Sequence, residues 1–335
     1  MIKPLLICSL VANIALAAAE TDDSDIELFD DSPIKTETMQ VEVISDEEFN
    51  EAIRQYPGLI EKIQTERLAA QNPYVLLPHR PNYFMPLSYQ TKINQEEQEQ
   101  FFSRAVNEQQ QENNRNAGFE NVEFVFQLSI KYIIAENLLG KFGNLAVAYT
   151  NKSFWQAYNK NISAYFRETN HEPEIFVTYN PKWAWIDHMS LSFNHQSNGQ
   201  VGNLSRSWNR LILSGAKVWS DKLMNVRAWY RIPETAKADP EDPTDNDNPD
   251  IDDYLGYGDV FFQKKLFADQ SISATFRNNL NVDENRGSIE LDWTFPLKGK
   301  ARGFVQYFNG YGESLIDYNQ YQERIGVGIK IADWL

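Results

Sequence analysis

The stretch LSFNHQSNGQ, residues 191–200, contains a histidine and a serine whose spacing could support nucleophilic catalysis. His195 precedes Ser197 by two positions, and Asn198-Gly199 follows the serine. An imidazole beside a serine hydroxyl can take its proton and leave the oxygen as a nucleophile. His-x-Ser is a short pattern, however, and Asn-Gly is also typical of a polar hairpin turn. The elements that carry these residues must decide between the two interpretations.

The beginning of the 335-residue chain predicts export. Lys3 precedes the apolar run PLLICSLVANIALAAA, which ends on small residues that fit a cleavage site. We expect residues 1–19 to be a signal peptide, because the run is too short to span a bilayer comfortably. The single cysteine, Cys8, lies inside this segment, so the exported chain would contain no disulfide.

The acidity of the chain is concentrated near its start. The formal net charge is −16, and residues 20–51 contain thirteen acidic side chains against Lys35 alone. We interpret residues 20–72 as an acidic, flexible extension and expect no nucleic-acid partner for the chain. Residues 73–335 then form the folded domain.

The folded domain shows apolar side chains at every second position, which predicts β-strands. In GSIELDWTFPL and RIGVGIKIADWL, apolar residues alternate with polar or small ones. We count about twelve such segments, beginning near residues 80, 120, 143, 173, 185, 205, 223, 254, 270, 285, 300 and 322. No window after the signal is long and apolar enough for a transmembrane helix.

The connections between these segments alternate between short and long. Short connections are expected near 135–142, 181–184, 220–223, 268–270 and 297–300, and the longer ones include 92–119, 236–255 and 312–322. Tight turns at one rim and long loops at the other are typical of an outer-membrane barrel. The sequence therefore predicts an all-β fold, a transmembrane antiparallel β-barrel of 12 strands, which leaves no exposed sheet edge.

The polar and aromatic residues distinguish this barrel from a soluble sandwich. Charged side chains on the polar faces would line a lumen, and aromatic side chains near the strand ends would form membrane girdles. The predicted lumen residues are Arg277, Glu290, Asp292, Arg324 and Lys330, and the predicted girdle residues are Trp183, Trp185, Trp219, Tyr230 and Trp334.

The alternation places His195 and Ser197 on the lipid face. Leu191 and Phe193 belong to the apolar face of their strand, and period two continues that face to His195 and Ser197. Polar groups are costly against lipid unless they have a function. A hairpin that bends near residue 202 would set residue 195 opposite 209 and residue 197 opposite 207. Asn209 could then hold the imidazole of His195 in the tautomer that activates Ser197.

The motifs around these residues resemble a known family. NHQSNG followed by SRSWNR, with FRETNHEPE upstream and NPDI and GYGESLIDYN downstream, is similar to the outer membrane phospholipase A family of Gram-negative bacteria. The resemblance runs from about Pro73 to Leu335. It implies a calcium-dependent enzyme of the bacterial outer membrane that hydrolyses acyl esters of phospholipids and lysophospholipids and is active as a homodimer.

The resemblance also implies roles for individual residues. Ser197 would be the nucleophile, His195 the base and Asn209 its orienting partner, with the backbone N–H of Gly199 facing the oxyanion. For calcium, Ser163 in NISAYFRE would come from one subunit, while Gln200 and Ser205 would offer backbone carbonyls from the other. Asn151 in AYTNKSFW stands where the family has a dimer-interface glutamine, and Gln200 replaces an arginine common in the family.

Other functions stay open from the residues alone. A non-enzymatic barrel, acting as a pore or a binding module, would use the same polar cluster structurally, and a soluble secreted serine hydrolase is a further alternative. The acidic loop DPEDPTDNDNPDIDD does not match an EF-hand, because a loop starting at Asp245 would need glycine at 250 and glutamate at 256, where Asp250 and Gly256 stand.

Overall fold

The computed structural model describes residues 72, 74–99, 118–136, 138, 143–181, 185–235, 246–299 and 301–332. All of them belong to the second of two units, residues 46–335. The predicted signal peptide 1–19 and almost all of the acidic extension 20–72 lie outside the described residues, as do Trp183 and Trp334.

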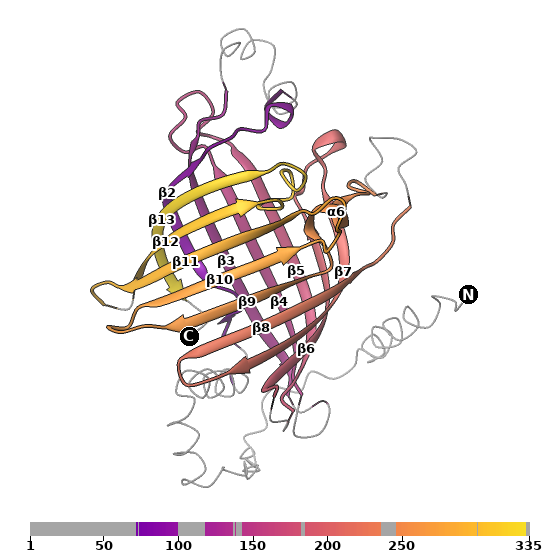
Figure 1. The fold of residues 1–335 in the computed structure, drawn as a ribbon, viewed down its shortest axis with the longest axis vertical. Helices are drawn as coiled ribbons and strands as arrows, with labels where there is room; N and C mark the ends of the chain where they lie inside the picture. Colours follow the sequence, from indigo (N-terminus) through magenta and orange to yellow (C-terminus); the bar gives the residue numbers. More distant parts are fainter. Residues whose placement is uncertain are drawn as a thin grey trace, which may run out of the picture. The chain divides into compact units, whose positions relative to one another are not determined.

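The described strands form one closed antiparallel sheet (Figure 1). A short strand, β1 (Leu77–Pro78), continues the line of β2 along the same edge of β3. The circuit is β2 (Asn82–Gln90), β3 (Val122–Ala135), β4 (Leu145–Trp155), β5 (Phe166–Tyr179), β6 (His188–Ser197), β7 (Ser207–Val218), β8 (Lys222–Arg231), β9 (Gly258–Lys265), β10 (Ser271–Asn278), β11 (Gly287–Pro296), β12 (Arg302–Gly310) and β13 (Gln322–Ala332). Because β13 pairs with β2, the twelve strands from β2 to β13 close into the predicted barrel.

The alternation of side chains follows the barrel wall. On β13 the apolar Ile325, Val327 and Ile329 are exposed on the outer face, whereas Arg324 and Lys330 are buried in the lumen. Exposed apolar side chains along the outer face of a closed barrel are the expected surface for lipid. Among the described residues, none of the helices has the length and apolar character of a membrane span.

The lumen is filled by paired charges. Arg167 Nε lies 2.6 Å from one carboxylate oxygen of Glu123, and Arg324 Nη2 lies 2.9 Å from the other. Lys330 Nζ lies 2.8 Å from Asp292 Oδ2. Buried charges are tolerated when each has a partner of opposite sign and good geometry, so these pairs stabilise the interior of the barrel.

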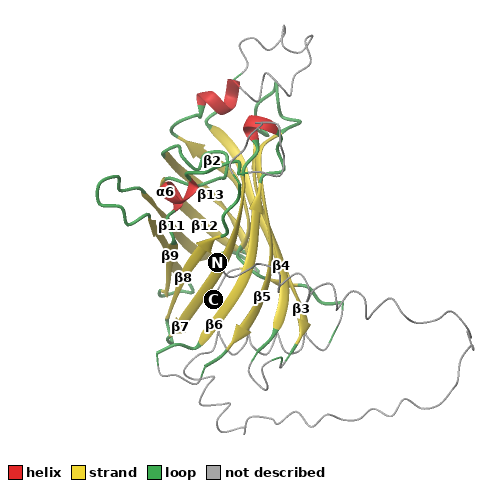
Figure 2. Ribbon diagram, turned by 90° about the vertical axis from the view of Figure 1, so that its right-hand side faces the viewer, coloured by secondary structure: helices red, strands yellow, loops and turns green. Residues whose placement is uncertain are grey.

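The two rims differ as predicted. At one rim the connections 136–144, 180–187, 219–221, 266–270 and 297–301 are short. At the opposite rim every connection is longer than these, except 198–206 and 279–286. The opposite rim holds the 3₁₀ helix η1 (Gly202–Leu204) and the helix α6 (Ile251–Leu255), which lies at the end of the barrel that carries the long connections (Figure 2).

Two strand starts differ from the sequence prediction. β5 begins at Phe166, seven residues before the expected start near 173, because residues 167–171 are all polar and so show no apolar row to alternate with the buried Arg167, Glu168 and Asn170. The segment expected to begin near 254 begins at Gly258, because residues 251–255 form α6 and bury Ile251 and Leu255.

Candidate active site

The β6–β7 hairpin places His195 and Ser197 on the outer face of the barrel. Leu191 and Phe193 are exposed on that face of β6, while Ser192 and Asn194 are buried on the other. His195 and Ser197 continue the outer row and are half-buried. Residues two apart on a strand lie about 7 Å apart and point the same way, so the two side chains are neighbours on one surface.

The pairing predicted from the sequence is confirmed. His195 is the cross-strand partner of Asn209, and Ser197 is the partner of Ser207. His195 Nδ1 lies 2.9 Å from Asn209 Oδ1, within hydrogen-bond distance. Among the described residues, no hydrogen bond joins Ser197 Oγ to His195. The imidazole is therefore held from its Nδ1 side, and its Nε2 side is left for another partner.

Glu234 lies behind Asn209 and was not identified by the sequence analysis. Asn209 Nδ2 donates a hydrogen bond of 2.6 Å to Glu234 Oε1. Glu234 follows the end of β8 and precedes the connection expected at 236–255, so it belonged to neither a predicted strand nor a predicted loop. The alternation of apolar and polar residues could not identify Glu234, because the residue lies beyond the end of β8.

The turn after Ser197 is fixed by Asn198 and Gly199. Asn198 is buried, its Nδ2 donates to Leu204 O at 2.8 Å, and its Oδ1 accepts from Arg206 N at 2.9 Å. Gly199 has φ +64°, a conformation that favours glycine. The turn interpretation thus describes Asn198 and Gly199, while Ser197 itself ends the strand on the outer face.

A second histidine lies on the other side of Ser197. His171 of β5 is the cross-strand partner of Ser197, and its Nδ1 lies 2.5 Å from the hydroxyl of Tyr149 on β4. A Cβ added to Gly199 would lie 3.7 Å from His171 Nε2. Side chains at every second position of a strand share a face, so His171 lies on the same outer face as Pro173 and Ile175.

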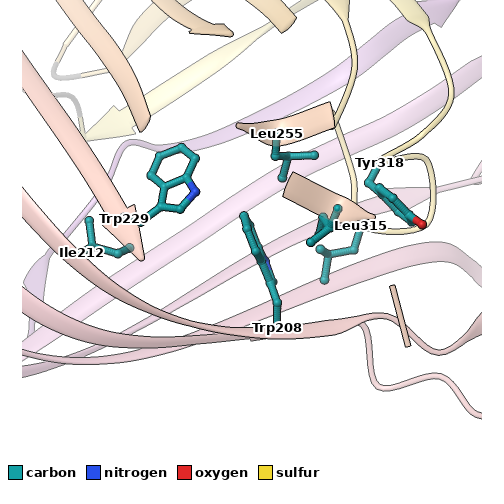
Figure 3. Close-up of a cluster of buried hydrophobic side chains, with 7 residues drawn as sticks. Trp208, Ile212, Trp229, Leu255, Leu315 and Tyr318 are labelled. Carbon is teal, nitrogen blue, oxygen red and sulfur yellow. The ribbon is translucent and has the colours of Figure 1, made fainter. Parts of the chain in front are cut away.

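The inner face of the hairpin is packed against a buried apolar cluster (Figure 3). Trp208 is fully buried, meets Trp229 edge to face, and donates from Nε1 to Gln196 Oε1 at 2.8 Å. Trp208 and Gln196 alternate with the outward-pointing residues on β7 and β6. The remaining members of the cluster are Ile212, Ile251, Leu255, Leu315 and Tyr318. Packing behind the hairpin therefore fixes the positions of the side chains in front of it.

A tyrosine hydrogen bond joins two long connections behind this cluster. The Tyr318 hydroxyl donates to Asp250 Oδ1 at 2.5 Å. Burial raises the pKa of Tyr318, and the hydrogen bond to Asp250 raises it further. Tyr318 therefore keeps its proton and remains a hydrogen-bond donor at neutral pH.

The predicted calcium residues lie on two separate connections. Gln200 and Ser205 flank η1 between β6 and β7, and Ser163 lies between β4 and β5. Ser205 Oγ donates to Asp247 Oδ2 at 2.7 Å, whereas the carbonyl of Ser205 accepts from Arg206 Nη1 at 2.7 Å. Ser163 O accepts from the indole of Trp155, and none of the described contacts joins Ser163 to Gln200 or Ser205.

These oxygens suit a hard cation. Calcium binds six to eight oxygen ligands drawn from carbonyls, carboxylates and water. The hydroxyl of Ser163, the carbonyls of Gln200 and Ser205 and the nearby carboxylate of Asp247 are all of this kind. Within the described residues no group of three or more His, Cys, Asp or Glu side chains forms a metal cluster, so most ligands of a cation here would be neutral oxygens.

Asn151 lies on the outer face two strands from the nucleophile. It pairs with Leu128 on β3 and with His171 on β5. Its Oδ1 accepts a hydrogen bond of 2.9 Å from Ser153 Oγ. Asn151, His171 and Ser197 thus form one row across β4, β5 and β6.

Comparisons with known proteins relate the whole barrel to one family. The sequence pattern of the family described as phospholipase A1 matches residues 59–331. A relative from Neisseria meningitidis serogroup B, named provisionally as a phospholipase A1, is 39% identical over 261 residues; the match covers 76% of this chain and 65% of the relative. This chain thus spans just under two thirds of that relative's length.

Two solved structures share the fold. Outer membrane phospholipase A from Escherichia coli, in an active-site mutant with alanine in place of an asparagine, superposes with a TM-score of 0.68 at 31% identity, covering 79% of this chain and 94% of that chain. The Salmonella typhi outer membrane phospholipase, a dimer with bound calcium, gives a TM-score of 0.68 at 31% identity, covering 81% of this chain and 97% of that chain.

Proposed function

The chain belongs to the phospholipase A1 family, and we propose that it hydrolyses acyl esters of phospholipids and lysophospholipids in the outer membrane with Ser197 as the nucleophile. Members of this family are carboxylic ester hydrolases, and the barrel places this chain in the outer membrane with its relatives. The single observation that carries the assignment of residues is the His195–Asn209 pair beside Ser197 on the outer face.

The reaction starts with proton transfer from Ser197 to His195. Asn209 Oδ1 accepts a hydrogen bond from Nδ1–H of the imidazole, which leaves Nε2 as the base. Ser197 Oγ then attacks the ester carbonyl, and the alcohol leaves with the proton carried by His195. Water hydrolyses the acyl-enzyme in a second step with the same base. Catalytic hydrogen bonds are often long before substrate binds, which is consistent with the open Ser197–His195 pair.

The oxyanion of the tetrahedral intermediate would face the backbone N–H of Gly199. Gly199 lies two residues beyond Ser197, is exposed and has the left-handed conformation, and no acceptor for its N–H is found among the described residues. Donors placed where negative charge develops contribute large rate accelerations. The substrate approaches sideways from the outer leaflet, so the site needs no deep pocket.

Calcium and a second subunit complete the proposal. Ser163 of one subunit and the carbonyls of Gln200 and Ser205 of the other would hold the ion, after Arg206 leaves the Ser205 carbonyl. Bound calcium supplies positive charge that stabilises developing negative charge on the substrate. The Salmonella typhi neighbour, a dimer with bound calcium, supports a calcium-bound dimer for this chain. In that dimer Asn151 would face the partner within the membrane.

The alternative of a non-enzymatic pore is less well supported. Arg80 Nη1 lies 2.7 Å from Glu172 Oε2, and Arg210 Nη2 lies 3.1 Å from Glu172 Oε1, so paired side chains cross the lumen. These pairs join different segments of the chain inside the barrel, where Arg80 and Glu172 also line a cavity. They do not explain why polar side chains gather on the outer face.

Fatty-acid release from phospholipid in mixed micelles tests the proposal. Purified protein with calcium is compared with Ser197→Ala and with Ser207→Ala, which changes the serine opposite Ser197 on β7. We expect Ser197→Ala to abolish release and Ser207→Ala to retain most of it. Release by Ser197→Ala at the wild-type rate would refute the assignment.

A further inference from the structure

Glu234 occupies the position behind the amide that orients the candidate base. Asn209 bridges two groups: its Oδ1 lies 2.9 Å from His195 Nδ1, and its Nδ2 lies 2.6 Å from Glu234 Oε1. The contact with Glu234 is the shorter of the two, and it joins an amide to a carboxylate. Charge-assisted hydrogen bonds of this kind are stronger than those between neutral groups.

The carboxylate decides which end of the amide faces the imidazole. A side-chain amide has a donor end and an acceptor end, and rotation by 180° exchanges them. An ionised carboxylate only accepts hydrogen bonds, so Glu234 requires the NH₂ group of Asn209 on its own side. The oxygen of Asn209 must then face His195.

This orientation sets the tautomer of the base. With the Asn209 oxygen at Nδ1, the imidazole proton resides on Nδ1, and Nε2 keeps its lone pair for the proton of Ser197. With the amide reversed, Nδ1 would accept from the NH₂ group, and the proton would reside on Nε2. A neutral imidazole of that form could not take a proton from Ser197 through Nε2.

The backbone beyond β8 brings Glu234 to Asn209, and no cation neutralises its carboxylate among the ion pairs of the described residues. Ile232 N donates to Asn209 O at 2.8 Å, which extends the pairing with β7 beyond the end of β8. The neighbouring cation, Arg231, is directed elsewhere: its Nη2 donates to Asn246 Oδ1 and to Asn248 O. Glu234 Oε2 is buried and has no hydrogen-bond partner among the described residues. Its negative charge is therefore directed toward Asn209 without a neutralising partner there.

We propose that Glu234 is a positioning residue that extends the candidate triad to Ser197–His195–Asn209–Glu234. It fixes the orientation of the Asn209 amide, and its charge stabilises the imidazolium that forms during the reaction. This inference rests on the proposed function. It assigns no contact between Glu234 and the substrate.

A double-mutant cycle tests whether Glu234 acts through Asn209. Glu234→Ala, Asn209→Ala and the double variant are compared for kcat and KM in calcium-containing mixed micelles. We expect Glu234→Ala to lower kcat by roughly 10- to 100-fold with little change in KM, as partners of catalytic groups commonly do. In the Asn209→Ala background, Glu234→Ala should cause less than about a 3-fold further loss, because its target is gone.

The pH profile separates the charge of Glu234 from its shape. Glu234→Gln keeps the size of the side chain and an acceptor oxygen but loses the charge. We expect kcat/KM between those of wild type and Glu234→Ala, with the acidic limb of its profile moved to lower pH, because an imidazolium without the nearby carboxylate loses its proton more readily. Other titratable groups on the outer face of the neighbouring strands are His171 on β5, Tyr149 on β4 and Tyr230 on β8, and all three are unchanged.

The control is Glu284→Gln, an exposed acid in the β10–β11 connection of the same rim. Within the described part of the chain, its carboxylate forms an ion pair with Arg286 alone. It should leave kcat, KM and the pH profile unchanged. Heat-modifiable electrophoretic mobility checks that each variant forms the barrel.

Two outcomes would overturn the inference. One is wild-type kcat and pH profile in Glu234→Gln and Glu234→Ala. The other is an equal fractional loss from Glu234→Ala with and without Asn209. Ser197→Ala distinguishes the two levels of the argument: if it abolishes hydrolysis while the Glu234 variants behave as wild type, the proposed function stands and only the role of Glu234 fails.

Discussion

At the scale of single residues, an outward polar row carries the proposed chemistry. On β6 the outward-facing side chains are first Leu191 and Phe193 and then His195 and Ser197. The hydrogen bond between His195 and Asn209 gives the imidazole a fixed Nδ1 partner at 2.9 Å. A polar group facing lipid is expensive, so its presence in ordered pairs is best explained by function.

His195→Ala and Asn209→Ala should differ in the size of their effect. Removing His195 removes the base, so we expect a loss in kcat of roughly 10³-fold or more. Removing Asn209 leaves the base but frees its orientation, so the loss should be smaller. Steady-state kinetics on purified, folded variants measure both values. Equal losses would contradict the separate roles of base and orienting partner.

At the scale of elements, the β6–β7 hairpin is positioned from its inner side. Trp208 and Gln196 bond to each other in the lumen, directly behind the row that contains His195, Ser197 and Asn209. α6 and the 311–321 connection complete the apolar cluster around Trp208 (Figure 3). The positions of His195, Ser197 and Asn209 on the outer face therefore depend on side-chain packing inside the barrel.

Trp208→Ala should destabilise the barrel by about 3–5 kcal/mol, because it removes a fully buried indole and leaves a cavity. The loss is measured as a shift in the urea midpoint for unfolding in detergent. Phe267→Ala is the matched control, since Phe267 is 80% exposed in the opposite, short-connection rim. A midpoint for Trp208→Ala as high as that of Phe267→Ala would contradict the proposed support.

Sequence alternation predicted the strands well and the residues between them poorly. Period two predicted the outward direction of His195 and Ser197 and their pairing with Asn209 and Ser207, because a strand has only two faces. The start of β5 was misplaced because Arg167 is buried through charge pairs, and Glu168 through hydrogen bonds from Asn170 and Asn198, which no hydrophobic pattern reveals. Glu234 was missed for a related reason: its position depends on the path of a loop, which has no period.

At the scale of the whole molecule, buried charge pairs hold the barrel wall together. Arg167 contacts Glu123, Glu97 and Asp317, which come from β3 and two long connections. Glu97 lies in the connection between β2 and β3 and is buried. The guanidinium group of Arg167 thus ties two long connections to the lumen.

Glu97→Gln should become progressively more stable than wild type as the pH rises. Burial raises the pKa of Glu97 well above its ordinary value, although Arg167 opposes the effect. A raised pKa in the folded state means that the protonated form adds stability below the ordinary value of 4.5, and that this stability is lost as the pH rises through the raised value. Urea midpoints of both proteins at pH 5 and pH 8 test this. A difference between the proteins that stays constant over this range would contradict it.

Calcium removal should stop hydrolysis without unfolding the barrel. We expect a chelator to abolish fatty-acid release and to reduce cross-linked dimer, while heat-modifiable mobility is unchanged, because the proposed ligands lie in rim connections and not in the strands. Ser163→Ala should raise the calcium concentration needed for half-maximal activity, whereas Ser220→Ala at the opposite rim should not. Full activity from a monomeric, calcium-free sample would contradict the dimer proposal.

The most direct test of the central claim is covalent labelling of the nucleophile. Purified protein in calcium-containing micelles is treated with a long-chain alkyl sulfonyl fluoride, and fatty-acid release is followed beside peptide mapping by mass spectrometry. We predict that one alkylsulfonyl group appears on the peptide containing Ser197, in proportion to the activity lost, and that Ser197→Ala shows neither label nor hydrolysis. Complete inactivation with Ser197 unmodified and another serine labelled would contradict the account.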